Sequence, residues 1–286
     1  MNTIIDTAEN FNTIIKPKNK LFEVDFGEIW RYRDLYSMFV KRDIITQYKQ
    51  TVLGPAWFFI QPALTTIMYM VVFGGIAGIS TDGLPQPLFY LAGIVFWQYF
   101  SDCLNKTSST FTANQAIFGK VYFPRMIVPL ATVTSNLVRM GIQFLLFIAV
   151  YIYYAVLGVG VAPNIYILLI PLLILMLAGL ALGFGIIVSS LTTKYRDLTI
   201  LFTFFVSLWM YATPVIYPLS TMSENRQWIM ALNPVTGIME AFKYGALGVG
   251  TFSWGMLAYS FGFMVVLLAL GIVVFNKVQR SFMDTV

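Results

Sequence analysis

The chain has 286 residues, of which 58% are hydrophobic and only 11% are charged, and its formal net charge is +5. Soluble globular domains contain about 45–50% apolar and about 25% charged residues, so this composition excludes an ordinary soluble protein and indicates several membrane spans. The sequence has no histidine, the commonest general base and metal ligand, and we expect neither a metal site nor a histidine-based catalytic site. No basic motif interleaved with aromatic residues occurs, and we expect no nucleic-acid binding.

The N-terminal part divides into two segments. Residues 1–24 are polar, and we expect a flexible cytosolic lead that is not a cleaved signal peptide. Residues 25–53 carry apolar side chains at helical spacing between charged ones, which predicts an amphipathic helix at the membrane surface. The apolar stripe changes sides near Lys41–Asp43, which predicts a bend there. Gly54-Pro55 then predicts an elbow into the first span.

Residues 54–280 are interpreted as one all-α membrane domain with six transmembrane helices. Each apolar stretch approaches the roughly 20 residues that cross a hydrocarbon core of about 30 Å. The predicted spans are residues 56–79, 88–104, 127–157, 165–191, 198–217 and 254–275. Residues 281–286 are expected to form a cytosolic tail.

Two connections between spans are too long to be simple turns. Residues 111–123 predict a short cytosolic coupling helix between spans two and three, which Phe123-Pro124-Arg125 ends. Residues 219–252 contain two half-length apolar stretches separated by Asn233-Pro234. This pattern predicts a pair of re-entrant helices in the outer leaflet between spans five and six, a form tolerated where protein buries the broken backbone.

The distribution of cations predicts the orientation. All but three of the 18 Lys and Arg residues fall in the segments that are cytosolic if both termini are cytosolic; the exceptions are Arg139, Arg226 and Lys243. Positive charge is enriched in cytosolic loops, so we expect a multi-pass protein with both termini in the cytosol.

Five short sequence blocks, in this order, resemble the signature blocks of one family. They are Tyr48-Lys49-Gln50-Thr51-Val52-Leu53-Gly54-Pro55-Ala56-Trp57 with Gln61-Pro62, Phe123-Pro124-Arg125 with Pro129-Leu130, Tyr195-Arg196-Asp197, Asn233-Pro234, and Glu240-Ala241-Phe242-Lys243. Together they resemble the permease subunits of polysaccharide ABC exporters, type-2 ABC permeases that export O-antigen, capsule or teichoic-acid chains. Lys243 departs from the pattern, which more often has arginine there, so a role that needs a forked guanidinium is in doubt.

The resemblance implies a function and partners. It implies a non-enzymatic permease of the bacterial inner membrane that moves a lipid-linked polysaccharide through a channel between two copies of the chain. Two copies of a separate ABC ATPase subunit would bind ATP and Mg²⁺, so this chain would bind no cofactor itself. The absence of a Gly-x-x-x-x-Gly-Lys-Ser/Thr phosphate loop from the sequence agrees with that division.

The resemblance also implies that the interfacial helix and the segment 111–123 contact the ATPase. The candidate contact residues are Arg31, Arg33, Gln115, Phe118, Lys120, Tyr122 and Arg196. The alternative is that this loop lies on the lipid headgroups.

Aromatic residues on spans one, two and five are candidates for the substrate path, because sugar rings stack their C–H faces on aromatic rings. The candidates are Trp57, Phe58, Tyr69, Trp97, Tyr99, Trp209, Tyr211 and Tyr217. The alternative for each is the belt of interfacial aromatic residues that many membrane proteins have.

Three charges fall within apolar segments, where charged residues are costly and usually functional. Arg139 lies within span three, and Glu240 and Lys243 are three residues apart in the re-entrant segment. They are candidates for a gate or a subunit contact; simple pairing of Glu240 with Lys243 is the alternative. Gly179 and Gly183 in span four are interpreted as a site of close helix packing.

Three other functions compete with polysaccharide export. A type-2 ABC permease for a small amphipathic drug or a lipid would share the topology. A membrane-embedded glycosyltransferase or acyltransferase would need paired acidic residues or a histidine, which the sequence lacks. A secondary transporter is disfavoured, because we expect no acidic residue in the middle of a span.

Overall fold

The computed structural model describes residues 26–159, 162–195 and 197–281. Within these ranges every regular element is helical and no strand occurs. The predicted lead 1–24, residues 282–286 of the predicted tail, and the candidate contact residue Arg196 lie outside the described residues.

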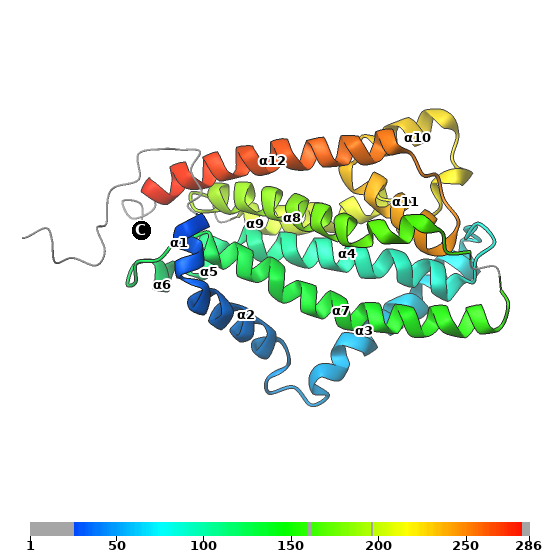
Figure 1. Cartoon of the computed structure of the whole chain (residues 1–286), viewed down its shortest axis with the longest axis horizontal. Helices are drawn as coiled ribbons and strands as arrows, with labels where there is room; N and C mark the ends of the chain where they lie inside the picture. The colour runs from blue at the N-terminus through cyan, green and yellow to red at the C-terminus, as the bar shows by residue number, and fades with distance from the viewer. Residues whose placement is uncertain (1–25, 160–161, 196, 282–286) are drawn as a thin grey trace, which may run out of the picture.

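Long helices run side by side along the long axis of the molecule (Figure 1). They are α4 (Gln86–Ser108), α7 (Ile127–Val156), α8 (Ile170–Thr192) and α12 (Trp254–Ser281), and the 3₁₀ turn η4 (Ile165–Leu169) leads into α8. In the part of the chain that the structure describes, four segments are long and apolar enough to cross a membrane: Gly54–Ile76, Ile127–Val156, Ile165–Thr192 and Trp254–Gln279. A shorter apolar segment comprises α9 (Leu198–Trp209) and the turn η5 (Met210–Ala212). The chain is therefore an all-helical membrane protein, and six crossings stay a prediction.

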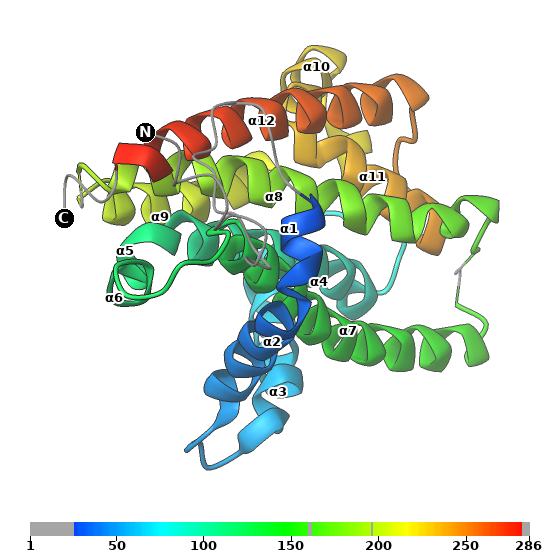
Figure 2. The ribbon, with the colours of Figure 1, turned by 60° about the vertical axis from the view of Figure 1, so that its left-hand side comes forward.

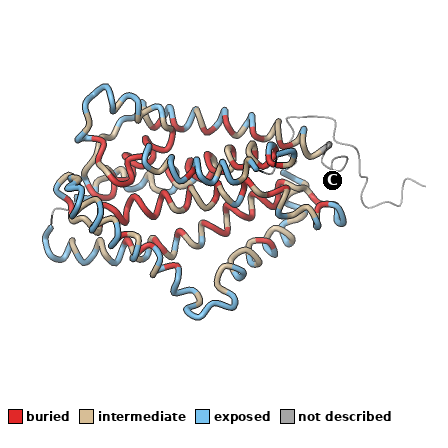
Figure 3. The backbone as a smooth tube through the Cα atoms, turned by 180° about the vertical axis from the view of Figure 1, so that it is seen from behind, coloured by how far each residue is buried: buried red, intermediate tan, exposed pale blue. Residues whose placement is uncertain are grey.

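Helix α4 forms the centre of the bundle. It packs against α7 and α8, and α3 and α9 also contact it. Nearly all of its side chains from Leu88 to Leu104 are buried, as the red tube in Figure 3 shows. Phe96 on α4 stacks on Phe242 of α11 with ring centroids 4.0 Å apart. Because neighbouring helices bury α4, its polar residues need not face lipid, although they make α4 a weak candidate for a membrane span when its sequence is taken alone.

The N-terminal helices differ from the sequence prediction. Helix α1 (Phe26–Arg31) ends before Tyr32, and α2 (Arg33–Tyr48) continues without interruption through the predicted bend at Lys41–Asp43, so that prediction is wrong. The physical reason is tertiary: α2 packs along the first half of α7, and the Tyr36 hydroxyl lies 2.5 Å from the Thr134 hydroxyl.

The predicted elbow before the first span is confirmed. Gln50 and Gly54 both have positive φ, 65° and 51°, and the 3₁₀ turn η2 (Gly54–Ala56) follows. Helices α2 and α3 (Trp57–Tyr69) consequently form a V that projects from the bundle (Figure 2). A π-helical segment, η3 (Met70–Ile76), continues α3.

The connection between α4 and α7 contains two four-residue helices where one was predicted. They are α5 (Thr110–Ala113) and α6 (Gln115–Phe118). Their aromatic side chains belong to a second apolar cluster, in which Phe111 stacks on Phe275 of α12 with centroids 4.7 Å apart. The loop therefore packs against α2, α7, α8 and α12.

The region after α9 contains the helix pair that the sequence predicted. The turn η6 (Leu219–Thr221) precedes α10 (Glu224–Ala231) and α11 (Pro234–Leu247), and Asn233 caps α11 by accepting a hydrogen bond from the Val235 amide at 3.0 Å. Helix α11 is almost entirely buried, whereas α10 has no buried residue. The depth of the pair in the membrane stays a prediction.

Candidate substrate path and partner surface

A cavity of about 140 Å³ lies between α3, α4 and the segment that follows α9. Two of the predicted path residues line it, Tyr69 on α3 and Trp97 on α4. The Tyr69 hydroxyl donates to the Met210 sulfur at 3.1 Å, which joins α3 to η5. The structure thus brings one aromatic residue of each of the first and second predicted spans together with Met210 and Val215 of the fifth.

The other predicted path residues are spread over different environments. Trp57 and Tyr211 are exposed, 44% and 55%, and the Tyr217 hydroxyl donates to the Tyr211 carbonyl at 2.9 Å. Trp209 is half-buried and meets Phe100 edge to face at 5.3 Å.

Tyr99 and Phe58, which were also predicted for the path, are buried and do not line the cavity. Tyr99 lies two residues after Trp97 and therefore on another face of α4, where its hydroxyl is buried in the core. The sequence identified these residues as aromatic but did not show which face of the helix each occupies.

Arg139, predicted within a span as a candidate for a gate or a subunit contact, has an acidic partner in the same chain. Its guanidinium Nη1 lies 2.6 Å from the Asp102 carboxylate on α4, and its Nη2 donates to the Gln61 side chain on α3 at 2.8 Å. Nearby, the Lys106 ammonium donates to Asn136 on α7 at 2.9 Å. This polar cluster joins α3, α4 and α7. On α4 its residues lie on the C-terminal side of the residues that line the cavity.

Sequence reasoning did not single out Asp102 and so missed this ion pair. A signal was present: a charged residue in one span usually finds an opposite charge in a neighbouring span. The separation of 37 residues between Asp102 and Arg139 becomes contact only because α4 and α7 pack together.

Glu240 and Lys243 do not form the simple pair that was one alternative. The Lys243 ammonium donates to the Pro214 carbonyl and lies 4.1 Å from the centroid of the Phe89 ring. Glu240 instead accepts hydrogen bonds from the Thr251 amide at 2.9 Å and the Thr251 hydroxyl at 3.2 Å. Both side chains are only 1% exposed, so neither reaches a surface where a second subunit would touch it. Lys243 thus connects α11 to the segment after η5, and Glu240 connects α11 to the segment before α12.

The α1 end of the bundle gathers the predicted ATPase contacts. Arg31, Arg33, Lys120 and Tyr122 are exposed, and Gln115 is half-buried. The Tyr122 hydroxyl donates to Glu28 at 3.4 Å, which links the α5–α6 loop to α1.

Phe118 is the exception, because it is 4% exposed and packs between Phe111 and Phe123. Sequence reasoning placed it on the partner surface, whereas the structure places it beneath that surface. Any effect of Phe118 on a partner is therefore indirect, through the position of the loop.

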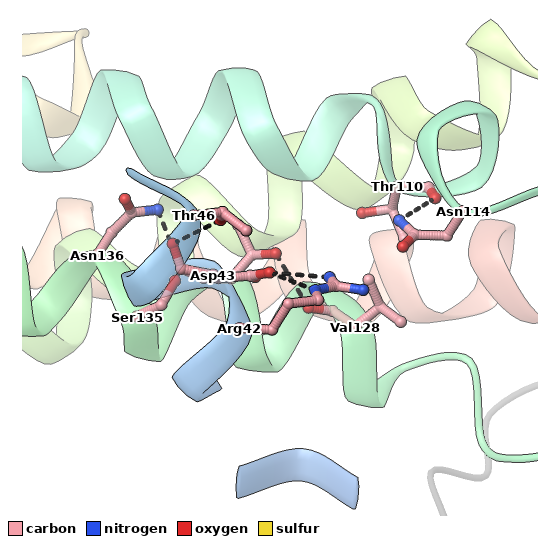
Figure 4. Close-up of polar contacts among 9 residues, drawn as sticks. Arg42, Asp43, Thr46, Thr110, Asn114, Val128, Ser135 and Asn136 are labelled. Atoms are coloured by element: carbon pink, nitrogen blue, oxygen red, sulfur yellow. Dashed lines mark hydrogen bonds and ion pairs between the residues drawn. The ribbon is translucent and has the colours of Figure 1, made fainter. Parts of the chain in front are cut away.

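Short-range polar contacts also occur within α2 and within the loop. Arg42 donates twice to Asp43, at 2.8 and 3.0 Å, and Asn114 donates to the Thr110 carbonyl at 2.9 Å (Figure 4). In the described ranges no group of three or more His, Cys, Asp or Glu residues is arranged to hold a metal ion.

Comparisons with known proteins match nearly the whole helical domain. Residues 34–247 match the family model described as "ABC-2 type transporter". An O-antigen export system permease protein, RfbA, of Klebsiella pneumoniae is 27% identical over 253 residues, which cover 88% of this chain and 94% of the relative. RfbA of Myxococcus xanthus is 27% identical over 219 residues, 76% of this chain and 81% of the relative. The polysialic acid transport protein KpsM of Escherichia coli is 23% identical over 255 residues, 85% and 93% of the two chains.

The family model spans nearly all of helix α2, the elbow, the bundle from α3 to α9 and the buried helix α11. These elements carry the cavity, the Arg139 cluster and most of the predicted partner surface. The chain accordingly belongs to the ABC-2 type transporter family, as a membrane permease related to permeases of O-antigen and capsule export.

Proposed function

We propose that this chain is the membrane subunit of an ATP-driven exporter that moves a lipid-linked polysaccharide across the bacterial cytoplasmic membrane. Two copies of the chain form the channel, and two copies of a separate ATPase subunit bind ATP and Mg²⁺. The observation that carries the proposal is the alignment with O-antigen export permeases over 88% of this chain and 94% of the relative.

The exposed apolar faces of α3 and α9 support a channel between two copies. Large apolar side chains cover both, among them Ile67, Met68, Ile200 and Phe204, each 53–77% exposed. Both helices contact α4 and flank the aromatic cavity, so a second copy placed against them would enclose that cavity in a shared passage.

The distribution of charges supports six crossings with both termini in the cytosol. In that arrangement α4 and the α9–η5 segment add two crossings to the four long apolar helices. The exposed Arg31, Arg33 and Lys120 then lie at the cytosolic end, where positive charge is enriched. A basic surface of this kind is suited to an acidic partner surface.

The test is deletion of the gene in its own host, with complementation by the wild-type chain. We expect surface polysaccharide to disappear and the lipid-linked chain to accumulate inside the cell, and an affinity-tagged chain to retain an ATPase subunit. Normal surface polysaccharide together with new sensitivity to an amphipathic drug would contradict the proposal and favour the drug or lipid permease.

A further inference from the structure

Helix α12 connects the α5–α6 loop at one end of the bundle with α11 near the other end (Figure 1). It has 28 residues and contains no proline. At about 1.5 Å of rise per residue, it is roughly 42 Å long. Sharp kinks in helices arise mainly at prolines and π-bulges, and α12 has neither, so its two ends move together.

Two contacts fix the C-terminal end of α12 to the α5–α6 loop. Arg125, at the end of this loop, donates from Nη1 to the Gln279 carbonyl at 2.8 Å. A cation at this end of a helix also complements the partial negative charge of the helix dipole. Phe111 of the loop stacks on Phe275 of α12, and both rings are fully buried. A displacement of the loop therefore displaces this end of α12.

The opposite end of α12 is fixed to α11. The Tyr259 hydroxyl donates to the Leu232 carbonyl, just before α11, at 2.9 Å. Glu240 on α11 accepts a hydrogen bond from the Thr251 amide, three residues before α12 begins. A Cβ atom on Gly237 of α11 would lie 2.8 Å from a backbone carbonyl oxygen of α12, so the two helices touch along their backbones.

Helix α11 is fixed in turn to the segment that follows α9. Lys243 donates to the Pro214 carbonyl, and Asn233 donates to the Ala212 carbonyl at 2.8 Å. Ala212 ends the turn η5, whose first residue, Met210, lines the cavity of the candidate substrate path. A continuous series of contacts therefore runs from the α5–α6 loop through α12 and α11 to the wall of the cavity.

Helices α4 and α7 also reach α11, through aromatic rings. Phe96 on α4 and Phe147 on α7 have ring centroids 4.0 and 5.6 Å from that of Phe242 on α11. Ring contacts permit sliding, whereas a hydrogen bond weakens steeply when its angle is distorted. The hydrogen bonds at the ends of α12 therefore make it the stiffer connection.

We propose that α12 transmits the movement of the α5–α6 loop to α11 and to the channel wall near η5, and that Arg125 and Tyr259 are the positioning residues at its two ends. The inference rests on the proposed function, in which the ATPase moves this loop. It adds a route by which nucleotide binding at one end of the chain changes the channel at the other.

The test measures movement directly, in the complex of this chain with its ATPase in lipid nanodiscs. The parent chain carries Cys103→Ala, which removes the single cysteine, and Glu224→Cys, which places a spin label at an exposed position on α10. Pulsed EPR measures the distance between the labels of the two copies without nucleotide and with a non-hydrolysable ATP analogue and Mg²⁺. Export of glycan is measured in the same variants without the label.

One conservative variant disconnects each end of α12. Arg125→Met removes the donor to the Gln279 carbonyl, and its control, Lys277→Met, removes an exposed cation from the same end of α12. Tyr259→Phe removes only the hydroxyl that reaches Leu232, and its control, Tyr153→Phe, removes the hydroxyl of an exposed tyrosine on α7.

We expect the nucleotide analogue to change the distance between the labels in the parent chain and in both controls. Both test variants should lose at least about half of that change and export glycan at least about threefold more slowly. The variant with both substitutions should be no slower than the more affected single variant, because the two ends belong to one route.

A full change of distance in Tyr259→Phe, or losses that multiply in the double variant, would overturn the inference and leave the proposed function standing. If Arg125→Met releases the ATPase, Tyr259→Phe decides the question, because it lies at the other end of α12. Failure of the wild-type complex to export glycan would overturn both proposals.

Discussion

The Arg139 guanidinium on α7 lies 2.6 Å from the Asp102 carboxylate on α4, and the same guanidinium reaches Gln61 on α3. One side chain thus connects the central helix to the first predicted span, which has few other polar attachments.

Removing Asp102 tests the importance of this pair. Asp102→Ala leaves the partly buried Arg139 without its counter-charge, and we expect a loss of about 3–5 kcal/mol of stability. Thermal unfolding of the nanodisc-embedded chain measures the effect. Asp43→Ala breaks an ion pair on α2 whose arginine is more exposed, 39% for Arg42 against 14% for Arg139, and is expected to change stability by less than about 1 kcal/mol. Equal unfolding midpoints for the two variants would contradict the role given to Asp102.

Lys243 satisfies a backbone carbonyl in the break that follows α9. Lys243→Met keeps most of the side-chain volume but leaves the Pro214 carbonyl without this donor, and we expect a loss of about 1–3 kcal/mol. Lys194→Met, at an exposed position in the α8–α9 turn, is the matched control. Unfolding midpoints that do not separate the two variants would show that the Pro214 contact contributes little.

Tyr122 and Phe118 now have different expected phenotypes, although both were predicted as ATPase contacts. Tyr122→Ala removes an exposed side chain and should leave the dimer and the fold intact while uncoupling ATP hydrolysis from export. Phe118→Ala opens a cavity in the second apolar cluster and should cost about 3–5 kcal/mol. Tyr153→Ala, which truncates an equally exposed tyrosine on α7, controls for the loss of surface area. Coupled hydrolysis and export in Tyr122→Ala would remove that residue from the partner surface.

Gly93 marks the closest approach of α4 to the segment after α9. A Cβ atom there would lie 2.7 Å from the Val215 carbonyl oxygen, a backbone atom that cannot move freely. We expect Gly93→Ala to cost about 1–3 kcal/mol. Gly262→Ala on α12, where a Cβ meets nothing within 4 Å, is expected to stabilise the chain by about 0.5–1 kcal/mol. Opposite shifts of the unfolding midpoint are the diagnostic result.

The long apolar helices could be predicted because hydrophobic length depends only on local sequence. The elbow at Gly54-Pro55 and the break at Asn233-Pro234 were equally local, since proline and glycine restrict or free the backbone by themselves. The close helix packing predicted at Gly179 is also confirmed, because a Cβ there would lie 2.6 Å from the Met264 sulfur on α12.

The errors share one cause, which is that a partner far along the chain decided the outcome. The stripe along α2 suggested a bend, but packing on α7 keeps α2 in one piece. Glu240 and Lys243 are close in sequence, yet Thr251 and Pro214 offered each a better partner. The facing of Trp97 and Tyr99 likewise depended on where α3 and η5 pack against α4, which helical periodicity alone does not contain.

The π-helical segment Met70–Ile76 has a consequence for chain length. A π-helical turn holds more residues than an α-helical turn, so removal of one residue between 70 and 76 would allow ordinary i→i−4 bonding to resume. Such a deletion would leave Trp57 to Tyr69 undisturbed, and because the π-helical segment already absorbs the extra residue, the side chains beyond it would keep nearly the same directions. Homologous chains that are one residue shorter in this stretch would therefore present the same first-span surface and nearly the same turn after it.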